Sequence, residues 1–274
     1  MDFHHVLHLV PARGLFVLGL TLASPSYGFI QVVDQQITLD YVADVGSVDI
    51  ELRPANDSVL VVSTTFTNQD ATSDSVQLHV GQEILPDYAD LFQSRYYQGI
   101  GSAIYVFYLG DLTFPRNASI INDSGGDKEH ETFSAVQLSG ITLTDSQFTS
   151  WQTDDKTISV GFGNALNNHS FTIWSAGNEN KQKLETWIPS TPDDSAWNHD
   201  IGSNHAAGWA YDLSPVGNGN VGFETEHNGK STMVALNLNA AIQIPEPSTY
   251  ALFFGAFSSL VILIRRKKGS SLLD

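Results

Sequence analysis

Residues 102–109 read SAIYVFYL, an almost continuous run of apolar and aromatic side chains. A strand with one wet face alternates apolar and polar residues, whereas a strand covered on both faces is apolar at nearly every position. The run is too short for a typical helix and is rich in β-branched and aromatic residues. It therefore predicts a central strand of a sheet that other elements cover on both sides.

Period-two alternation extends from this stretch over most of the chain. The segments SVDIEL and VQLHV alternate apolar and polar residues, as strands with one solvated face do. Further runs of this kind, separated by turn residues, predict strands at 29–41, 47–53, 58–67, 75–80, 102–114, 132–144, 157–163, 170–176, 221–226 and 232–238. About ten strands with polar connections predict an all-β fold, an antiparallel β-sandwich with the jelly roll as a candidate topology.

Three connections carry local predictions. Asn228-Gly229 lies between two alternating runs, and both residue types adopt the positive φ that a type I′ hairpin turn requires. Residues 87–97 are compatible with one or two helical turns, and residues 189–207 have the composition of a long surface loop. No internal repeat of fixed period is evident, so we treat residues 29–243 as one exported domain.

The charge balance excludes several classes of function. The chain has 30 Asp and Glu against 13 Lys and Arg, and residues 29–244 contain 27 acidic and 8 basic side chains. Such a surface repels phosphate backbones, so nucleic acid is not an expected partner. The chain contains no cysteine, which excludes disulfides, thiol nucleophiles and cysteine-ligated zinc.

The N-terminus has the features of a signal peptide over residues 1–28. A segment with one arginine and three histidines precedes the apolar run LFVLGLTLA, and the small, turn-forming residues SPSYG follow it. The apolar run is too short to span a bilayer, and the order of the three parts is typical of a cleaved export signal. Cleavage after Ala23 and cleavage after Gly28 both satisfy the small-residue requirement, with Gly28 slightly preferred.

The C-terminus contains a candidate membrane segment. Residues 248–264 carry no charge, and Arg265, Arg266, Lys267 and Lys268 follow at once. These 17 residues would form a helix of roughly 25 Å, slightly short for a hydrocarbon core of about 30 Å. The basic cluster predicts that the C-terminal end stays in the cytoplasm while the body is exported.

Pro245-Glu246-Pro247 stands directly before that segment. The two prolines fix the backbone and hold Glu246 extended, a shape that suits a protease or transpeptidase groove. The order of this tripeptide, a short apolar run and a basic cluster resembles the PEP-CTERM sorting signal of Gram-negative bacteria. The resemblance covers about 30 residues, 244–274, and implies recognition by an exosortase in the inner membrane, cleavage near the tripeptide and export linked to exopolysaccharide.

Two clusters of acidic and histidine residues are candidates for a metal or catalytic site. Asp123, Asp127, Glu129 and Glu131 surround a Gly-Gly bend, and such oxygens could bind Ca²⁺, although their spacing is not that of an EF-hand. A solvated acidic loop is the competing interpretation, and no other cofactor is expected. His199, Asp200 and His205 form the second cluster, but the histidines lack the spacing of a zinc-binding helix.

Tryptophans suggest a carbohydrate ligand. Indole rings stack on sugars, and Trp187, Trp197 and Trp209 border polar segments, which makes them candidates for an exposed stacking surface. Packing in the core is the competing role for each of them.

We therefore expect an exported, non-enzymatic protein of the cell envelope or extracellular matrix, held at the inner membrane before processing. Its role would be structural or adhesive, with exopolysaccharide as a candidate partner. The alternatives are a secreted protein that binds or cleaves polysaccharide on the same β-sandwich, and a simple membrane-anchored surface protein.

Overall fold

The computed structural model describes residues 26–27, 30–38, 47–67, 71–81, 83–84, 89–122, 129–162, 169–201, 205–213 and 219–243. Every described element is a β-strand and every described strand pairing is antiparallel, so the all-β prediction is confirmed. Within these ranges, no helix is long and apolar enough to cross a membrane. Of the predicted signal peptide at 1–28 only Ser26 and Tyr27 are described, and the sorting tail after Gln243 lies outside the described residues.

The chain divides into two units, residues 28–241 and a smaller unit formed by the two ends. In the smaller unit, β1 (Ser26–Tyr27) pairs with β19 (Ile242–Gln243). The larger unit, called the body below, contains four sheets.

Two five-stranded sheets form the centre of the body. The first inner sheet has the order β2-β10-β4-β8-β7, and its strands are β2 (Gln31–Thr38), β10 (Glu129–Ser139), β4 (Ala55–Thr67), β8 (Ile100–Leu112) and β7 (Leu91–Tyr97). The second inner sheet has the order β11-β18-β13-β16-β15, with strands β11 (Ile141–Thr153), β18 (Ser231–Ala240), β13 (Ser170–Glu179), β16 (His205–Asp212) and β15 (Asp194–Ile201).

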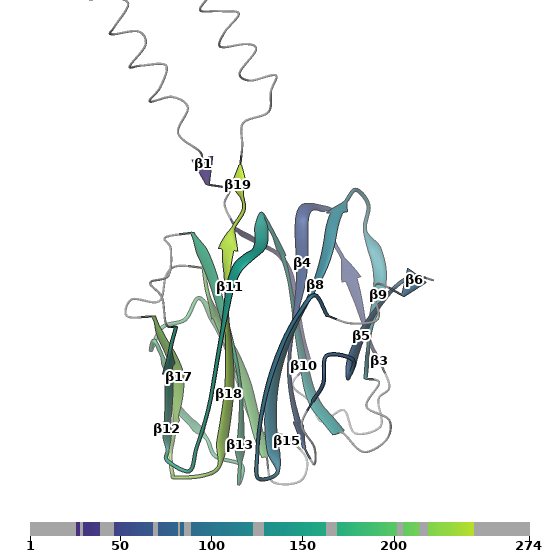
Figure 1. The fold of residues 1–274 in the computed structure, drawn as a ribbon. Helices are drawn as coiled ribbons and strands as arrows, with labels where there is room; N and C mark the ends of the chain where they lie inside the picture. Colours follow the sequence, from purple (N-terminus) through teal and green to yellow (C-terminus); the bar gives the residue numbers. More distant parts are fainter. Residues whose placement is uncertain are drawn as a thin grey trace, which may run out of the picture. The chain divides into compact units, whose positions relative to one another are not determined.

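Each inner sheet carries a smaller outer sheet. The first outer sheet has the order β3-β9-β5-β6, with strands β3 (Ser47–Leu52), β9 (Arg116–Asn122), β5 (Val76–Val80) and β6 (Glu83–Ile84). The second outer sheet has the order β12-β17-β14, with strands β12 (Thr157–Gly161), β17 (Asn220–Thr225) and β14 (Leu184–Ile188). Figure 1 shows the resulting layers, from β12 and β17 on the left to β3, β5 and β9 on the right.

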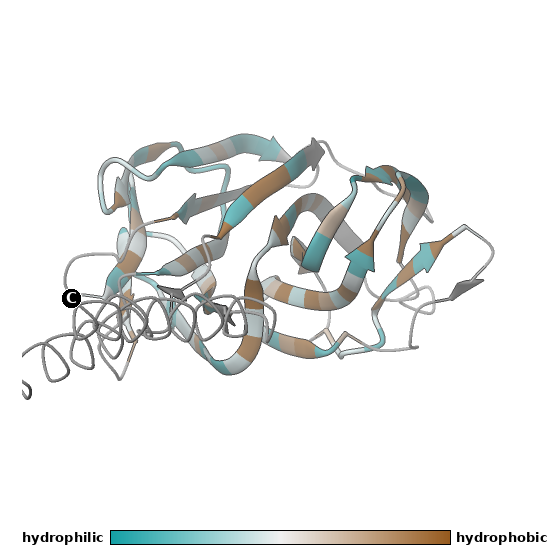
Figure 2. Cartoon of the chain, turned by 90° about the horizontal axis from the view of Figure 1, so that it is seen from above, coloured by the Kyte–Doolittle hydropathy of each residue, from teal (hydrophilic) through white to brown (hydrophobic). Residues whose placement is uncertain are grey.

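Three hydrophobic cores fill the spaces between the four sheets. The middle core lies between the two inner sheets and includes Val61, Ile104, Ile173, Trp209 and Leu236. The first-half core joins the first inner and outer sheets, and the second-half core joins the second pair. The central strands β4, β8, β13, β16 and β18 of the inner sheets are therefore buried on both faces, whereas the edge strands β7 and β11 are mostly half-buried. Figure 2 shows apolar residues along strands of the body.

The apolar segment 102–109 lies in a central strand, as predicted. In β8, residues 100–107 are buried, with Ile104 and Val106 in the middle core and Tyr105 and Phe107 in the first-half core. Coverage ends at Tyr108, which is 46% exposed. A continuous apolar run thus corresponds to a strand between two layers, as expected.

The two halves of the body repeat one topology. Chain order places β2, β3, β4, β5, β7, β8, β9 and β10 in the first half, and β11 to β18 follow in the same sequence. Both inner sheets order these eight-strand sets as first, eighth, third, sixth and fifth, and both outer sheets contain the second, seventh and fourth strands in that order. Only β6 has no counterpart among the described strands.

Residue positions match when strands are aligned by the side chains that face the middle core. Val59 and Val61 of β4 then correspond to Phe171 and Ile173 of β13. The strand registers carry this match to β10 and β18, where TFSAVQLSG (residues 132–140) corresponds to TMVALNLNA (residues 232–240). In both halves the pairing with the next strand becomes irregular at the same point, after Gln137 and after its counterpart Asn237.

The two halves are related by an approximate two-fold symmetry across the middle core. At one edge of the middle core, β7 contacts β11. At the other edge, β2 contacts the counterpart strands β15 and β16: Gln35 donates to Asp194 at 2.8 Å, and the Tyr211 hydroxyl donates to Gln35 at 3.0 Å. Because β2 corresponds to β11 and β7 to β15, exchanging the halves exchanges these two edges.

Three local predictions are wrong. Asn228-Gly229 does not form a hairpin, because β17 belongs to the second outer sheet and β18 to the second inner sheet, and neither residue has a positive φ. Residues 91–97 form the strand β7 instead of helical turns. The expected surface loop at 189–207 contains β15 and the start of β16, which pair with each other in the second inner sheet.

Candidate functional site

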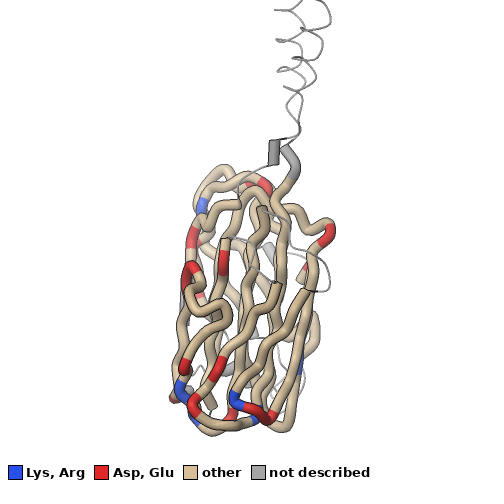
Figure 3. The backbone as a smooth tube through the Cα atoms, turned by 90° about the vertical axis from the view of Figure 1, so that its left-hand side faces the viewer, with Lys and Arg blue, Asp and Glu red and all other residues tan. Residues whose placement is uncertain are grey.

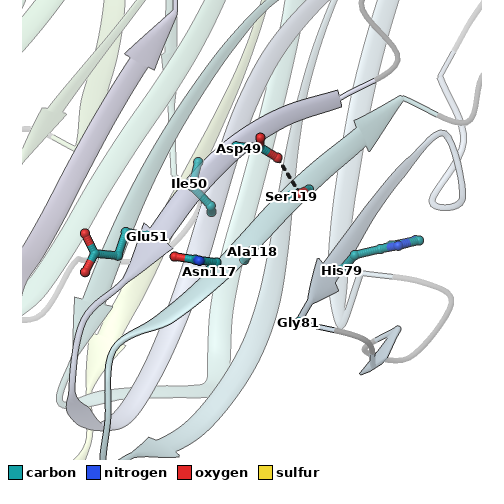
Figure 4. Close-up of a pocket in the computed structure, with 8 residues that line it drawn as sticks. All are labelled: Asp49, Ile50, Glu51, His79, Gly81, Asn117, Ala118 and Ser119. Carbon is teal, nitrogen blue, oxygen red and sulfur yellow. Dashed lines mark hydrogen bonds between the residues drawn. The ribbon is translucent and has the colours of Figure 1, made fainter.

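An open hollow of about 550 Å³ lies on the first outer sheet, on the side away from the core. It is lined by Asp49, Ile50, Glu51, His79, Gly81, Asn117, Ala118 and Ser119, which come from β3, β9, β5 and the turn after β5 (Figure 4). We call this site the outer hollow.

Strand alternation explains which side chains reach the outer hollow. On β3, Ile50 and Leu52 point into the first-half core, so Asp49 and Glu51 point outward. On β9, Ala118 and Ile120 are buried and the intervening Ser119 faces the outside. The same period brings polar residues of β3, β9 and β5 to one surface.

Register places three polar side chains in one row. Asp49 is opposite Ser119, and Ser119 is opposite His79. The Ser119 hydroxyl donates to Asp49 Oδ1 at 2.6 Å, and His79 Nε2 lies 3.3 Å from Gln77 Oε1. A nucleophilic triad places imidazole between carboxylate and hydroxyl, whereas here the hydroxyl lies in the middle and directs its proton to the carboxylate.

An ion-pair chain borders the hollow. Arg53 Nη1 lies 3.0 Å from Glu51 Oε1, and Arg53 Nε lies 3.2 Å from Asp34 Oδ2. Gln137 fixes the backbone of Arg53, because its side-chain amide accepts from the Arg53 amide at 2.8 Å and donates to the Arg53 carbonyl at 2.9 Å. Surface pairs of this kind stabilise a fold by about 0–1 kcal/mol, so this chain contributes little to the stability of the body.

The arrangement suits a hydroxyl-rich ligand. Carboxylate, hydroxyl, amide and imidazole groups offer both donors and acceptors over an open polar surface. Among the described residues, no three His, Asp or Glu side chains gather in a way that could hold a metal ion. Figure 3 shows acidic positions distributed along the body, with fewer basic ones, so the surface disfavours anionic ligands.

The corresponding surface of the second half lacks these groups. When β3 and β9 are aligned with β12 and β17 by their bounds and core-facing residues, Asp49 matches Ser159 and Ser119 matches Gly222. Gly222 cannot carry a side chain in this backbone, because a Cβ there would lie 2.0 Å from the Ile158 carbonyl oxygen. The outer hollow is therefore specific to the first half and is not a requirement of the repeated topology.

The tryptophans predicted to stack on glycans are not an exposed surface. Trp209 is 1% exposed in the middle core and Trp187 is 6% exposed in the second-half core, so for these two the prediction of exposure is wrong. Trp197 is half-buried against Trp187 and Phe223, and its indole nitrogen donates to the Gln182 carbonyl at 3.0 Å. The flanking polar residues misled the prediction, because β14, β15 and β16 are strands whose inner faces carry these rings.

The exposed indole is that of Trp151 on β11, with an exposed fraction of 57%. Sequence reasoning did not single it out. The sequence does contain a signal for it. In the segment QFTSWQT, Trp151 lies three residues after Phe148, so the two side chains are on opposite faces of the strand.

The other predicted site residues are placed as follows. Asp123 and Asp127 lie outside the described residues, and Glu129 and Glu131 belong to β10, of which only the backbone is described there. The calcium prediction thus stays untested.

In the histidine cluster, Asp200 pairs with Lys181, whose ammonium group lowers the pKa of that carboxyl. Pro245, Glu246, Pro247 and the basic cluster at 265–268 lie outside the described residues.

No protein-family model matches the chain, and no curated protein matches it. Three solved structures show a distant likeness. They are the PBSX exported protein XepA (8% identity, covering 77% of this chain and 87% of that chain, TM-score 0.23), YhaK from Escherichia coli (6%, 78% and 87%, 0.23) and the major capsid protein P2 from bacteriophage PM2 (9%, 76% and 97%, 0.22). At these TM-scores the likeness carries no argument about fold or function.

Proposed function

We propose that this chain is an exported protein of the cell envelope or extracellular matrix of a Gram-negative bacterium, delivered by an N-terminal signal and sorted through its C-terminal tail. One observation carries the proposal: residues 245–268 combine Pro-Glu-Pro, an uncharged apolar run and a basic cluster in that order. The tail would hold the protein in the inner membrane until an exosortase-type enzyme acts at Pro245-Glu246-Pro247. The competing proposal is a simple membrane anchor.

For the body, we propose two antiparallel β-sandwiches of the jelly-roll type in tandem. Successive strands alternate between the inner and outer sheet through β2, β3, β4 and β5, and again through β11, β12, β13 and β14. Each inner and outer pair shares its own core, which is the packing expected for a sandwich. The middle core then joins the two sandwiches into one unit.

The role of the body is structural or adhesive, with contact to exopolysaccharide at the outer hollow. Its support is the row of Asp49, Ser119 and His79 on an open surface, because sugars offer hydroxyl groups to such donors and acceptors. A glycan-cleaving activity is the alternative that Asp49 and Glu51 favour, since both carboxylates project from β3 on the same side. Release of new reducing ends from a glycan that the body binds would support this alternative.

The test of sorting is the intact mass of the exported protein in a host that has an exosortase. Replacement of Pro245, Glu246 and Pro247 by alanine should leave the tail uncleaved and change both the mature mass and the location of the protein. Alanine replacement of residues 269–271, which lie beyond the basic cluster, is the matched control and should leave processing unchanged. An unchanged mass and location in the first variant would show that the tail is only an anchor.

A further inference from the structure

Trp151 stands out because its large apolar ring is exposed while the other four tryptophans pack against the cores. Trp174 and Trp209 are fully buried, Trp187 is buried and Trp197 is half-buried. An indole 57% exposed on a regular strand contributes little to folding through burial. A function at the surface would explain its presence.

The backbone beneath Trp151 is fixed. Residues 147–153 of β11 pair continuously with β18, and Trp151 is opposite the fully buried Met233. Directly opposed residues share one face of a sheet, so Trp151 projects on the side of the second-half core but from the edge strand. A ring held on a paired strand loses little conformational freedom when a ligand binds.

The segment of β11 that carries Trp151 is polar and uncharged. Thr149 and Thr153 lie on the same side of β11 at the two adjacent positions of the alternation, and the segment SQFTSWQT (residues 146–153) has no charge. Beyond it, Asp154 accepts a hydrogen bond from the Tyr97 hydroxyl at 3.0 Å. The Thr153 hydroxyl donates to Asp155 Oδ2 at 3.3 Å and accepts from the Asp155 amide at 3.1 Å. These two carboxylates would repel an anionic ligand, whereas the hydroxyl groups beside the ring suit a neutral one.

The repeated topology shows that the fold does not require this ring. Trp151 is opposite Met233, and the counterpart of Met233 in the first half is Phe133, which pairs with Thr38. Thr38 thus occupies the position of Trp151 in the other half. One half carries a small polar residue where the other carries the largest apolar side chain.

We propose that Trp151, Thr149 and Thr153 form a second carbohydrate-binding surface, at which the indole stacks on a sugar ring of a neutral polysaccharide. The ligand would lie along the edge strand β11, with its hydroxyl groups bonded to the Thr149 hydroxyl and donating to the acceptor site of the Thr153 hydroxyl that Asp155 leaves open. This surface belongs to the second half and is separate from the outer hollow of the first half. This inference rests on the proposed contact with polysaccharide and specifies a neutral polysaccharide as the ligand.

The test is affinity electrophoresis of the purified exported protein in gels that contain a neutral glucan, a neutral mannan or a polyuronate. A neutral polymer should retard the wild-type protein. Trp151→Ala should weaken that retardation about tenfold in apparent Kd, and Trp151→Phe should retain part of it. The matched control is Phe114→Ala, which removes an aromatic ring that is 73% exposed in the first half and should change nothing.

Several results would overturn the proposal. They are unchanged retardation of Trp151→Ala, no retardation by either neutral polymer, or retardation by the polyuronate alone. Light scattering of the same samples adds another: a wild-type dimer that Trp151→Ala converts to monomer would assign the surface to a second copy of the chain. None of these outcomes depends on tail processing, so failure here is distinguishable from failure of the sorting proposal.

Discussion

Ser102 and Thr232, which are 130 residues apart and belong to different inner sheets, join their hydroxyl groups at 3.0 Å in a fully buried contact between the two halves. The Ser102 hydroxyl also lies 3.3 Å from the Thr232 carbonyl, and Ser175 donates to the Thr64 carbonyl at 3.2 Å nearby. One end of the interface is therefore polar and directional, while the middle core is apolar. Directional bonds of this kind fix how two sheets are aligned.

Thr232→Val should reveal the contribution of this contact. Valine preserves the shape of threonine but removes its hydroxyl group, leaving Ser102 with only the longer bond to the carbonyl. We expect a loss of about 1 kcal/mol in the free energy of unfolding, measured by urea denaturation. Thr157→Val, at an exposed position of β12, is the control and should be close to neutral. Equal stability of the two variants would mean that the buried bond contributes nothing.

Gly222→Ser should test why the second half has no outer hollow. The substitution introduces the residue that Ser119 provides in the first half, but its Cβ would meet the backbone oxygen of Ile158, which cannot rotate away. We expect destabilisation of about 3 kcal/mol. Gly229→Ala, whose Cβ would approach no atom closer than 3.3 Å, should cost much less, and thermal midpoints of the two variants make the comparison.

The outer hollow predicts a separate effect on glycan binding. Asp49→Asn keeps the size of the side chain but removes the charge that accepts the Ser119 hydroxyl proton. If a polysaccharide binds there, retention should fall roughly tenfold, because hydrogen bonds to charged groups are the stronger ones. Ser159→Ala at the equivalent position of the second half should leave retention unchanged. Loss of binding in both variants would point to general destabilisation instead.

Tyr211 predicts how stability changes at alkaline pH. Burial raises the pKa of its phenol, and the carboxylates of Asp194 and Asp193 add to the effect. Because the folded state favours the neutral phenol, its contribution to stability is complete below the pKa of an unfolded tyrosine, about 10, and is lost as pH rises toward the folded value. In Tyr211→Phe the thermal midpoint should start lower, since the bond to Gln35 is lost, but should fall less between pH 9.5 and about 11. Parallel curves for the two proteins would contradict this.

Much of the inner architecture could be predicted from sequence, because inner strands leave a strong signal. Residues 103–107 are all apolar because they alternate between two cores. The nine other strand predictions correspond to β2, β3, β4, β5, β10, β12, β13, β17 and β18, and the one at 132–144 runs past the end of β10 into β11. The β15–β16 region was missed because residues such as Gly208 and Ala207 are small and read as loop, although they lie in a buried strand. Gly208 is a glycine because the Trp197 ring fills the space that a side chain would occupy: a Cβ on Gly208 would lie 2.4 Å from that ring.

The repeated topology could not be found as a sequence period, because the connections between corresponding strands differ in length. Leu236 follows its counterpart Val136 by 100 residues, whereas Phe171 follows Val59 by 112. Connections of different length shift each strand pair by a different amount, so no single offset aligns the halves. The candidate site was equally hidden, because Asp49, Ser119 and His79 meet only through the register of three strands that are distant in sequence.

A very short connection joins the two halves. Gly140, with φ of 72°, is the single residue between β10 and β11. Ser139 is opposite Gln31 at the start of β2, Ile141 is opposite Ala240 at the end of β18, and the Ala241 amide donates to the Gly140 carbonyl at 2.8 Å. The two ends of the body therefore meet beside the connection between the halves, as a two-fold repeat requires.

A circular permutant should consequently fold. Residues 30–241 would be opened at Gly140, and their original ends would be joined by a short Gly-Ser linker, which exchanges the order of the halves while keeping every strand pairing. We expect one cooperative thermal transition and wild-type near-ultraviolet circular dichroism, because buried Trp174 and Trp209 report on the second-half and middle cores. Opening the chain instead between Tyr105 and Val106 divides a central strand of the first inner sheet and should abolish the transition. If the Gly140 permutant unfolds like this control, the halves do not behave as interchangeable modules, and the one-residue connection itself determines how they pack.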